Sequence, residues 1–130
     1  MYNCNLSCNG ESRLKLEITI SDTRKEIYDV LIDTGFTATS IFGLKLPLEY
    51  AQYARNLYTS SISLADTNEI PVQYVCGIVT KIEGKILKKK VPLWTFFMKG
   101  KPIIGMHFLQ KCKICFDGLK NTTSIEFDFL

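Results

Sequence analysis

The 130-residue chain contains a single histidine, His107, which excludes chemistry that needs a cluster of histidines. It has no long apolar segment either, because the run from Val91 to Met98 is too short to span a bilayer and contains Pro92. Its first ten residues have neither a basic start nor an apolar stretch, so they do not form a secretory signal. We therefore expect no association with a membrane and a cytoplasmic location.

A strong charge is also absent. The formal net charge is +3 and the sequence pI is about 8.6, well short of the concentrated positive charge of a dedicated nucleic-acid-binding protein. Internal repeats, low-complexity tracts and linker-like stretches are absent as well. Apolar residues make up 46% of the chain, which is enough for a sizeable core, and the length is typical of one domain. We expect residues 1–130 to form a single domain.

Five cysteines, an odd number, argue against a closed disulfide framework. A zinc site built from Cys4, Cys8, Cys112 and Cys115 would require the chain ends to meet, and the spacing of the first pair is unusual for zinc. The alternative is that these thiols and Cys76 are free, in a reducing compartment. We favour free thiols and expect no metal.

Residues Arg13 to Ile20 alternate between apolar and polar side chains, which predicts a half-buried strand. Ser21 to Lys25 is typical of a hairpin loop, and Glu26 to Ile32 predicts the returning strand. The end of that strand, Val30-Leu31-Ile32, is apolar on both faces. We therefore expect Asp33 to emerge from the middle of the fold.

Two helices are predicted. The segment Leu46 to Leu57 has Pro47 at the first helical position, and from Leu48 onward apolar residues follow at helical spacing. A shorter helix, Met106 to Gln110, follows Gly105.

The remaining apolar segments predict strands, with a turn at Glu83-Gly84. These strands are Tyr58–Leu64, Val72–Val79, Val91–Phe97, Lys113–Phe116 and Ser124–Phe129. Many short strands about ten residues apart, with one or two short helices, predict an all-β fold: a closed or partly open β-barrel, or a folded sheet.

The tripeptide Asp33-Thr34-Gly35 has two interpretations. By itself it is typical of a strand-ending turn, because Asp and Gly favour turns. Its setting favours a catalytic aspartate, since it follows a buried strand, and far downstream Ile103-Ile104-Gly105 supplies a second apolar pair closed by glycine.

Together these two segments resemble the aspartic proteases of the retroviral and single-domain kind. The run Val30 to Gly35 is similar to the family's first motif, and Pro102 to Leu109 is similar to its last motif. The resemblance covers Leu14 to Phe127, with a hairpin between the two motifs. It implies the β-barrel of the acid proteases and an endopeptidase that works as a homodimer on an extended polypeptide.

The resemblance also implies roles for single residues. Each of two chains would contribute Asp33 to a shared site, where one proton is held between two carboxylates and a water is activated without metal or organic cofactor. Thr34 would hydrogen-bond across the dimer, and Gly35 would bring its N–H close to the carboxylate. Ile104 and Gly105 would support the active loop from beneath.

The hairpin tip at Ala65, Asp66 and Thr67 would be the flap that closes over the substrate. Phe36 departs from the family pattern, since many relatives carry Ala or Ser at this position. Its large side chain must point into the core, or it narrows the cleft.

Two other functions remain open. One is a catalytically inactive relative that serves as a dimerisation or peptide-binding module. The other is a nucleic-acid-binding β-barrel that uses Lys85 to Lys90, with the run Lys88-Lys89-Lys90, and nearby aromatic residues, with an affinity that falls steeply with salt. We favour a solvated strand edge for these lysines, because charged side chains discourage pairing with other chains. For the protease domain itself, we expect the segment 1–12 to be either flexible or at the dimer interface.

Overall fold

The computed structural model describes residues 2–7, 11–21, 24–36, 42–63 and 68–127. Most of these residues lie in strands, so the all-β prediction is confirmed. In chain order the elements are β1 (Tyr2–Ser7), β2 (Arg13–Ser21), β3 (Arg24–Ile32), β4 (Leu44–Leu46), the 3-10 helix η1 (Leu48–Tyr53), β5 (Tyr58–Ser63), β6 (Glu69–Ile82), β7 (Lys85–Phe97), β8 (Ile103–Ile104), α1 (Met106–Leu109), β9 (Cys112–Asp117) and β10 (Thr122–Phe127).

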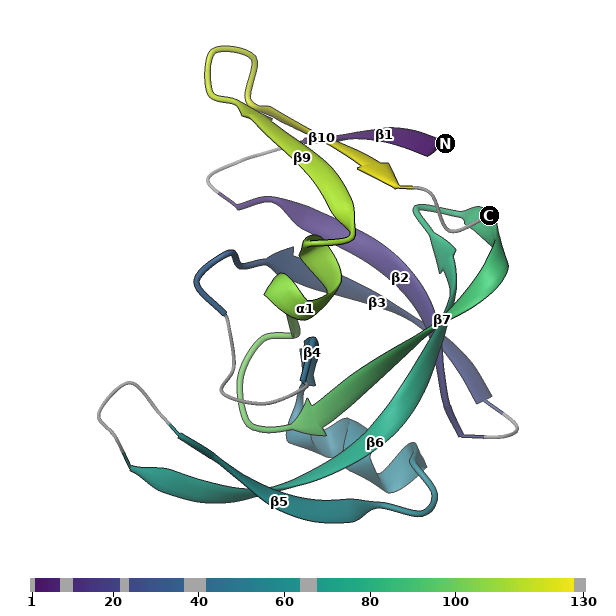
Figure 1. Cartoon of the computed structure of the whole chain (residues 1–130), viewed down its shortest axis with the longest axis vertical. Coiled ribbons are helices and arrows are strands. Elements are labelled where there is room, and N and C mark those ends of the chain that lie inside the picture. Colours follow the sequence, from purple (N-terminus) through teal and green to yellow (C-terminus); the bar gives the residue numbers. More distant parts are fainter. Residues whose placement is uncertain (1, 8–10, 22–23, 37–41, 64–67, 128–130) are drawn as a thin grey trace.

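The strands form two sheets (Figure 1). The larger sheet has the order β2-β3-β8-β4-β7-β6-β5, and β2 also pairs with β6, so that six strands close into a ring and β5 lies outside it. The pairs β3–β8 and β4–β7 are parallel, whereas the other pairs are antiparallel. The smaller antiparallel sheet has the order β1-β10-β9.

The main core lies inside the ring. The alternation in β2 places Leu14, Leu16 and Ile18 in this core with no exposed surface, and burial of each such side chain contributes roughly 1.5–3 kcal/mol. Ile125 and Phe127 of β10 belong to the same cluster. The small sheet is therefore joined to the ring by shared apolar packing.

A second apolar cluster lies apart from the main core and connects segments that are distant in the sequence. Its residues come from the loop after β3, from β5, from β6 and from β7. They are the buried Phe42, Val72 and Phe96, and the partly buried Phe36, Ile62, Ile70, Tyr74, Trp94 and Met98. This second cluster links the loop after β3 to the hairpin formed by β5 and β6.

The helix predicted from Leu46 to Leu57 is wrong in extent and type. Leu46 belongs to β4 and pairs with Phe97 of β7, and Pro47 has the extended backbone angles φ −56° and ψ 146°. What remains is the six-residue 3-10 helix η1, in which Leu48 is 47% exposed. The first residue of the predicted helix, Leu46, belongs instead to the strand β4. The helical segment that remains has six residues, which is too short for an apolar face with helical spacing to form.

The β6–β7 hairpin is longer than the predicted strands Val72–Val79 and Val91–Phe97. The turn at Glu83 and Gly84 is confirmed, with φ values of 48° and 77° that fit a two-residue hairpin turn. The exposed residues Lys88–Lys90 lie within β7. Three consecutive lysines gave no apolar alternation, so the first half of this strand could not be recognised.

The amino-terminal segment 1–12 was expected to be flexible or to lie at a dimer interface. Within it, Tyr2–Ser7 forms β1 and pairs antiparallel with β10, from Tyr2 opposite Phe127 to Ser7 opposite Thr122. Among the described residues, none of the helices has the length and apolar character needed to cross a membrane.

Candidate active site

Asp33 follows directly on the last residue of β3. The strand ends in Val30 and Ile32, which are 0% and 9% exposed, so the chain leaves the core at Asp33. The backbone N–H of Asp33 donates to the carbonyl oxygen of Ile104 at 3.0 Å, and the N–H of Ile32 donates to the carbonyl of Ser12 at 2.8 Å. The position of Asp33 is therefore set by backbone hydrogen bonds to two other segments.

The Asp33 carboxylate closes a tight turn. The backbone N–H of Gly35 donates to Oδ1 of Asp33 at 2.9 Å, and the N–H of Phe36 donates to the Asp33 carbonyl oxygen at 3.2 Å. A Cβ atom at Gly35 would lie 3.2 Å from the same Oδ1, which is tighter than ordinary contact. Asp33 is half-buried, whereas Thr34 and Gly35 are exposed. The turn thus holds one carboxylate oxygen and presents the dipeptide Thr34-Gly35 to the outside.

The second motif lies against the first. The N–H of Met106 donates to the carbonyl oxygen of Phe36 at 2.9 Å, and the N–H of Gly105 donates to the carbonyl of Gly43 at 2.9 Å. A Cβ atom at Gly105 would lie 1.9 Å from the ring of Phe36 and 2.4 Å from its carbonyl oxygen. Only glycine permits this approach, so Ile104 and Gly105 meet the Asp33 loop through backbone contacts.

Phe36 points into the second apolar cluster. Its ring stacks on Phe96 with a centroid distance of 5.8 Å and an interplanar angle of 18°, and Phe96 is only 1% exposed. The side chain of Phe36 therefore points into the core, which is the first of the two arrangements expected from the sequence. The loop that carries Asp33 is consequently packed against the cluster that also contains Ile62 and Ile70 of the β5–β6 hairpin.

An open hollow of about 500 Å³ lies beside Asp33. Its lining comes from the segment before β2, the end of β3, the turn after it and β9. The lining residues are Glu11, Ser12, Leu31, Ile32, Asp33, Thr34 and Phe116. Sequence reasoning missed three of these, because nothing in the local pattern of Glu11, Ser12 or Phe116 indicates that they approach Asp33.

The second carboxylate of the hollow, Glu11, forms ion pairs with two cations. Its oxygens lie 3.0 Å from Nζ of Lys101 and 2.8 Å from Nη2 of Arg13. The hydrogen bonds from Lys101 and then from Arg13 lower the pKa of Glu11 below its ordinary value. The next residue, Ser12, has a buried hydroxyl that is hydrogen-bonded to the buried hydroxyl of Thr123. Glu11 is thus held ionised, and it is a poor partner for sharing a proton with Asp33.

The expected flap residues Ala65, Asp66 and Thr67 lie outside the described residues. The strands that flank them, β5 and β6, pair from Tyr58 opposite Tyr74 to Ser63 opposite Glu69. In Figure 1 the β5–β6 ribbon extends away from the ring, on the side of the molecule where β3 ends. A long hairpin is therefore present where the sequence predicted one.

Of the four cysteines of the possible zinc site, Cys112 and Cys115 have described side chains, whereas Cys8 lies outside the described residues. Cys76, Cys112 and Cys115 are free thiols, and in the part of the chain that is described no group of three or more His, Cys, Asp or Glu side chains is close enough to hold an ion. Cys112 and Cys115 are three residues apart on β9, so their side chains point to opposite faces of the strand. Burial raises the pKa of Cys112 to about 11, whereas Cys115 is exposed.

Comparison with models of known families, with curated proteins and with solved structures finds no match in any of the three.

Proposed function

We propose that this protein is an aspartic endopeptidase that acts as a homodimer. The observation that carries the proposal is the meeting of the two motifs. The N–H of Asp33 bonds to Ile104, Gly35 closes on the Asp33 carboxylate, and Gly105 lies directly against Phe36. A strand-ending turn needs only the contact from Gly35. The further backbone contacts fix a carboxylate at the edge of a hollow, which suits a catalytic group.

The reaction requires a second copy of the same loop. Two Asp33 carboxylates brought close together cannot both stay ionised, so they share one proton. The ionised carboxylate takes a proton from a water molecule as the water oxygen bonds to the carbon of a peptide carbonyl. The protonated carboxylate donates its proton to the carbonyl oxygen, and a tetrahedral diol forms. Proton transfer to the nitrogen then allows the C–N bond to break, giving a carboxylic acid and an amine.

The second copy would approach over the exposed turn. Thr34 and Gly35 are exposed there, and Phe116, which lines the same hollow, is a large apolar side chain with 57% of its surface exposed. An exposed apolar residue next to the proposed catalytic group is typical of a contact surface. The polypeptide substrate would lie between the two turns and the β5–β6 hairpins, and it would hydrogen-bond through its backbone in an extended form.

Replacement of the catalytic carboxylate tests the proposal. We expect Asp33→Asn to remain folded and to lose hydrolysis of peptide substrates at mildly acidic pH, measured by release of new amino termini from an unfolded protein substrate. Asp29→Asn is the matched control, because Asp29 is an exposed carboxylate on β3, the strand that leads to Asp33, and this variant should keep its activity. Undiminished turnover by Asp33→Asn would refute the proposal that Asp33 is the catalytic group of an aspartic endopeptidase.

The alternative is a catalytically inactive module of the same fold that dimerises or binds peptides. The stacking of Phe36 on Phe96 is the observation that favours this alternative, because it gives the Asp33 loop a structural role that does not require catalysis. A statine-type inhibitor, which mimics the tetrahedral diol, separates the two functions. An endopeptidase binds it tightly through Asp33, whereas an inactive module dimerises without binding it.

A further inference from the structure

The long strand β6 changes its partner along one edge. It pairs with β5 as far as Tyr74, which lies opposite Tyr58, and it pairs with β2 from Ile78, which lies opposite Thr19. Between these two pairings, no strand of the described residues pairs with residues 75–77 on that edge. We call this three-residue gap the β6 notch.

The backbone of Cys76 points into the β6 notch. The carbonyl oxygen of Trp94 accepts a hydrogen bond at 3.0 Å from the N–H of Gly43, which lies on the side of β7 away from β6. Cys76 is directly opposite Trp94 in the antiparallel pair. When one member of such a pair turns its polar groups outward, its partner does the same in the opposite direction. The N–H and C=O of Cys76 are therefore directed to the edge that β5 and β2 leave open.

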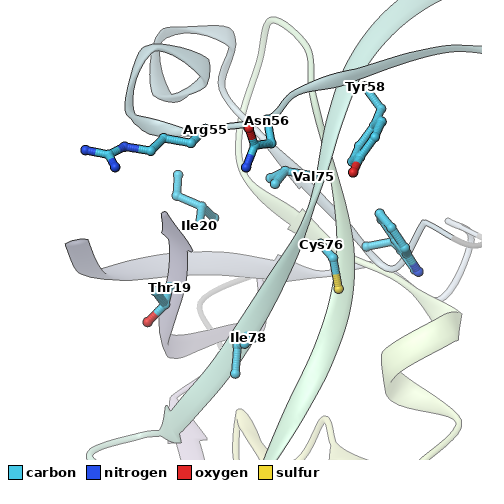
Figure 2. Close-up of a pocket in the computed structure, with 9 residues that line it drawn as sticks. Thr19, Ile20, Arg55, Asn56, Tyr58, Val75, Cys76 and Ile78 are labelled. Carbon is cyan, nitrogen blue, oxygen red and sulfur yellow. The ribbon is translucent and has the colours of Figure 1, made fainter. Parts of the chain in front are cut away.

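A cavity of about 430 Å³ occupies the β6 notch, and this volume lies within the usual range for small-ligand sites. Its residues come from the end of β2, the segment before β5, β5 itself, β6 and β7. They are Thr19, Ile20, Arg55, Asn56, Tyr58, Val75, Cys76, Ile78 and Trp94 (Figure 2). Arg55 is the one formally charged residue in this lining, and the lining contains no carboxylate. The cavity is therefore suited to an anionic ligand.

The apolar walls of the cavity are held in place by packing. Tyr74 contacts both Tyr58 and Trp94, each with a centroid distance of 5.6 Å, so the two aromatic lining residues share one support. On the other side, Ile20 and Val75 are 3% and 8% exposed. Figure 2 shows the Asn56 side chain directed toward the space between Ile20 and Val75, and the Arg55 side chain extending past Ile20, away from Cys76 and Tyr58. The site thus combines packed apolar walls, an open strand edge and one cation at its rim.

We propose that the β6 notch binds the carboxyl-terminal residue of a peptide whose last side chain is apolar. The peptide N–H and C=O pair with the backbone of Cys76, as in the addition of a strand to an open sheet edge. The free carboxylate lies at the rim of the notch and pairs with Arg55, whose exposed side chain turns toward it, and the apolar side chain packs against Tyr58 and Trp94. This site is separate from the hollow beside Asp33, since the two linings have no residue in common.

The thiol of Cys76 reports occupancy of the notch. The probe is N-acetyl-L-phenylalanine, which carries the amide, the carboxylate and an aromatic side chain, and the readout is the rate of alkylation by iodoacetamide at each cysteine, followed by peptide mass spectrometry. At a probe concentration about ten times the dissociation constant, we expect the Cys76 rate to fall about ten-fold. Cys115 is exposed on β9 and is the internal control, so its rate should not change.

Two related compounds and one variant separate the contributions of the ligand's carboxylate, its backbone amide and Arg55. N-acetyl-L-phenylalanine amide lacks the charge and 3-phenylpropionate lacks the backbone amide, so each should protect Cys76 less than the probe. Arg55 is exposed, and Arg55→Gln should stay folded while the acid loses its advantage over the amide. The proposal is overturned if the probe leaves the Cys76 rate unchanged, if it slows Cys115 equally, or if all three compounds protect alike.

The site does not depend on the proposed catalysis. Asp33→Asn should show the same protection of Cys76 as the unaltered protein, so failure of the endopeptidase and failure of the notch would be seen in different measurements. Loss of protection in Asp33→Asn would contradict the independence of the two sites.

Discussion

The loop that carries Asp33 and the β5–β6 hairpin differ in how they are held. Backbone hydrogen bonds fix the loop to one neighbouring segment through Ile104 and Met106, and the N–H of Ile32 before it bonds to Ser12. The hairpin strand β5 pairs with β6 alone, and one residue of β5, Ile62, is partly buried while the others are exposed. A region fixed by backbone and glycine contacts cannot adjust to an added atom, whereas a region held by one edge and a few side chains can move. The proposed function uses this difference, since the catalytic group must be fixed and the covering hairpin must open.

The largest expected effect is at Gly105. In Gly105→Ala the added methyl meets the ring and the carbonyl oxygen of Phe36, and backbone atoms cannot move away without breaking the hydrogen bond to Met106. We expect a loss of roughly 3 kcal/mol or more in the free energy of unfolding, measured in urea, together with loss of peptide hydrolysis.

Gly118→Ala is the control for this change. A Cβ atom at Gly118 meets nothing within 4 Å, so the free energy of unfolding should change by less than about 0.5 kcal/mol. If both alanine variants are equally stable, the loop is not fixed by its contact with Gly105.

A smaller effect is expected when side chains of the second cluster are removed from each region in turn. Phe36→Ala removes the stacking on Phe96, at a cost of about 2 kcal/mol, because the ring is only half-buried. Ile62→Ala removes a smaller, partly buried side chain from β5, at a cost of about 1 kcal/mol. Urea unfolding of both variants measures the two losses. An equal or larger loss at Ile62 would reverse the comparison between the loop and the hairpin.

The smallest effect concerns pH. Because Lys101 and Arg13 lower the pKa of Glu11 in the folded protein, protonation of Glu11 opposes folding. This contribution to stability is present above the ordinary pKa of 4.5 and is lost as pH falls through the lower pKa of the folded state. As the pH falls below 4.5, Glu11→Gln should therefore lose less stability than the unaltered protein does. Thermal unfolding across the acid range measures this difference. Identical pH profiles for the variant and the unaltered protein would contradict a role for this ion pair.

Local patterns predicted much of the framework. The alternation in Arg13–Ile20 marked β2, the pair Glu83-Gly84 marked a turn, and Gly105 marked the start of α1. Each of these features depends on residues that are neighbours in the chain. The resemblance to aspartic proteases also placed Ile104 beside the loop of Asp33, and the structure has that contact.

Features that depend on distant contacts could not be predicted. The alternation of Tyr2, Cys4 and Leu6 with polar residues is compatible with a strand, but its pairing with β10, more than a hundred residues away, could not be read from the local pattern. Glu11 and Phe116 line the hollow beside Asp33 although both are distant from it in the sequence. The gap in the sheet at Cys76 arises where β6 passes from one partner strand to another. The sequence around Cys76 alone does not indicate this change of partner.

The central claim is that two copies of Asp33 form one site, and mixing active and inactive chains tests it most directly. Unaltered protein and Asp33→Asn are combined in equal amounts at a fixed total chain concentration, subunits are allowed to exchange, and the rate of peptide hydrolysis is measured. If each site needs Asp33 from both chains, only dimers of two unaltered chains are active, and the rate falls to about one-quarter of that of the unaltered protein. A fall to about one-half would mean that each chain works alone, and would contradict the shared site.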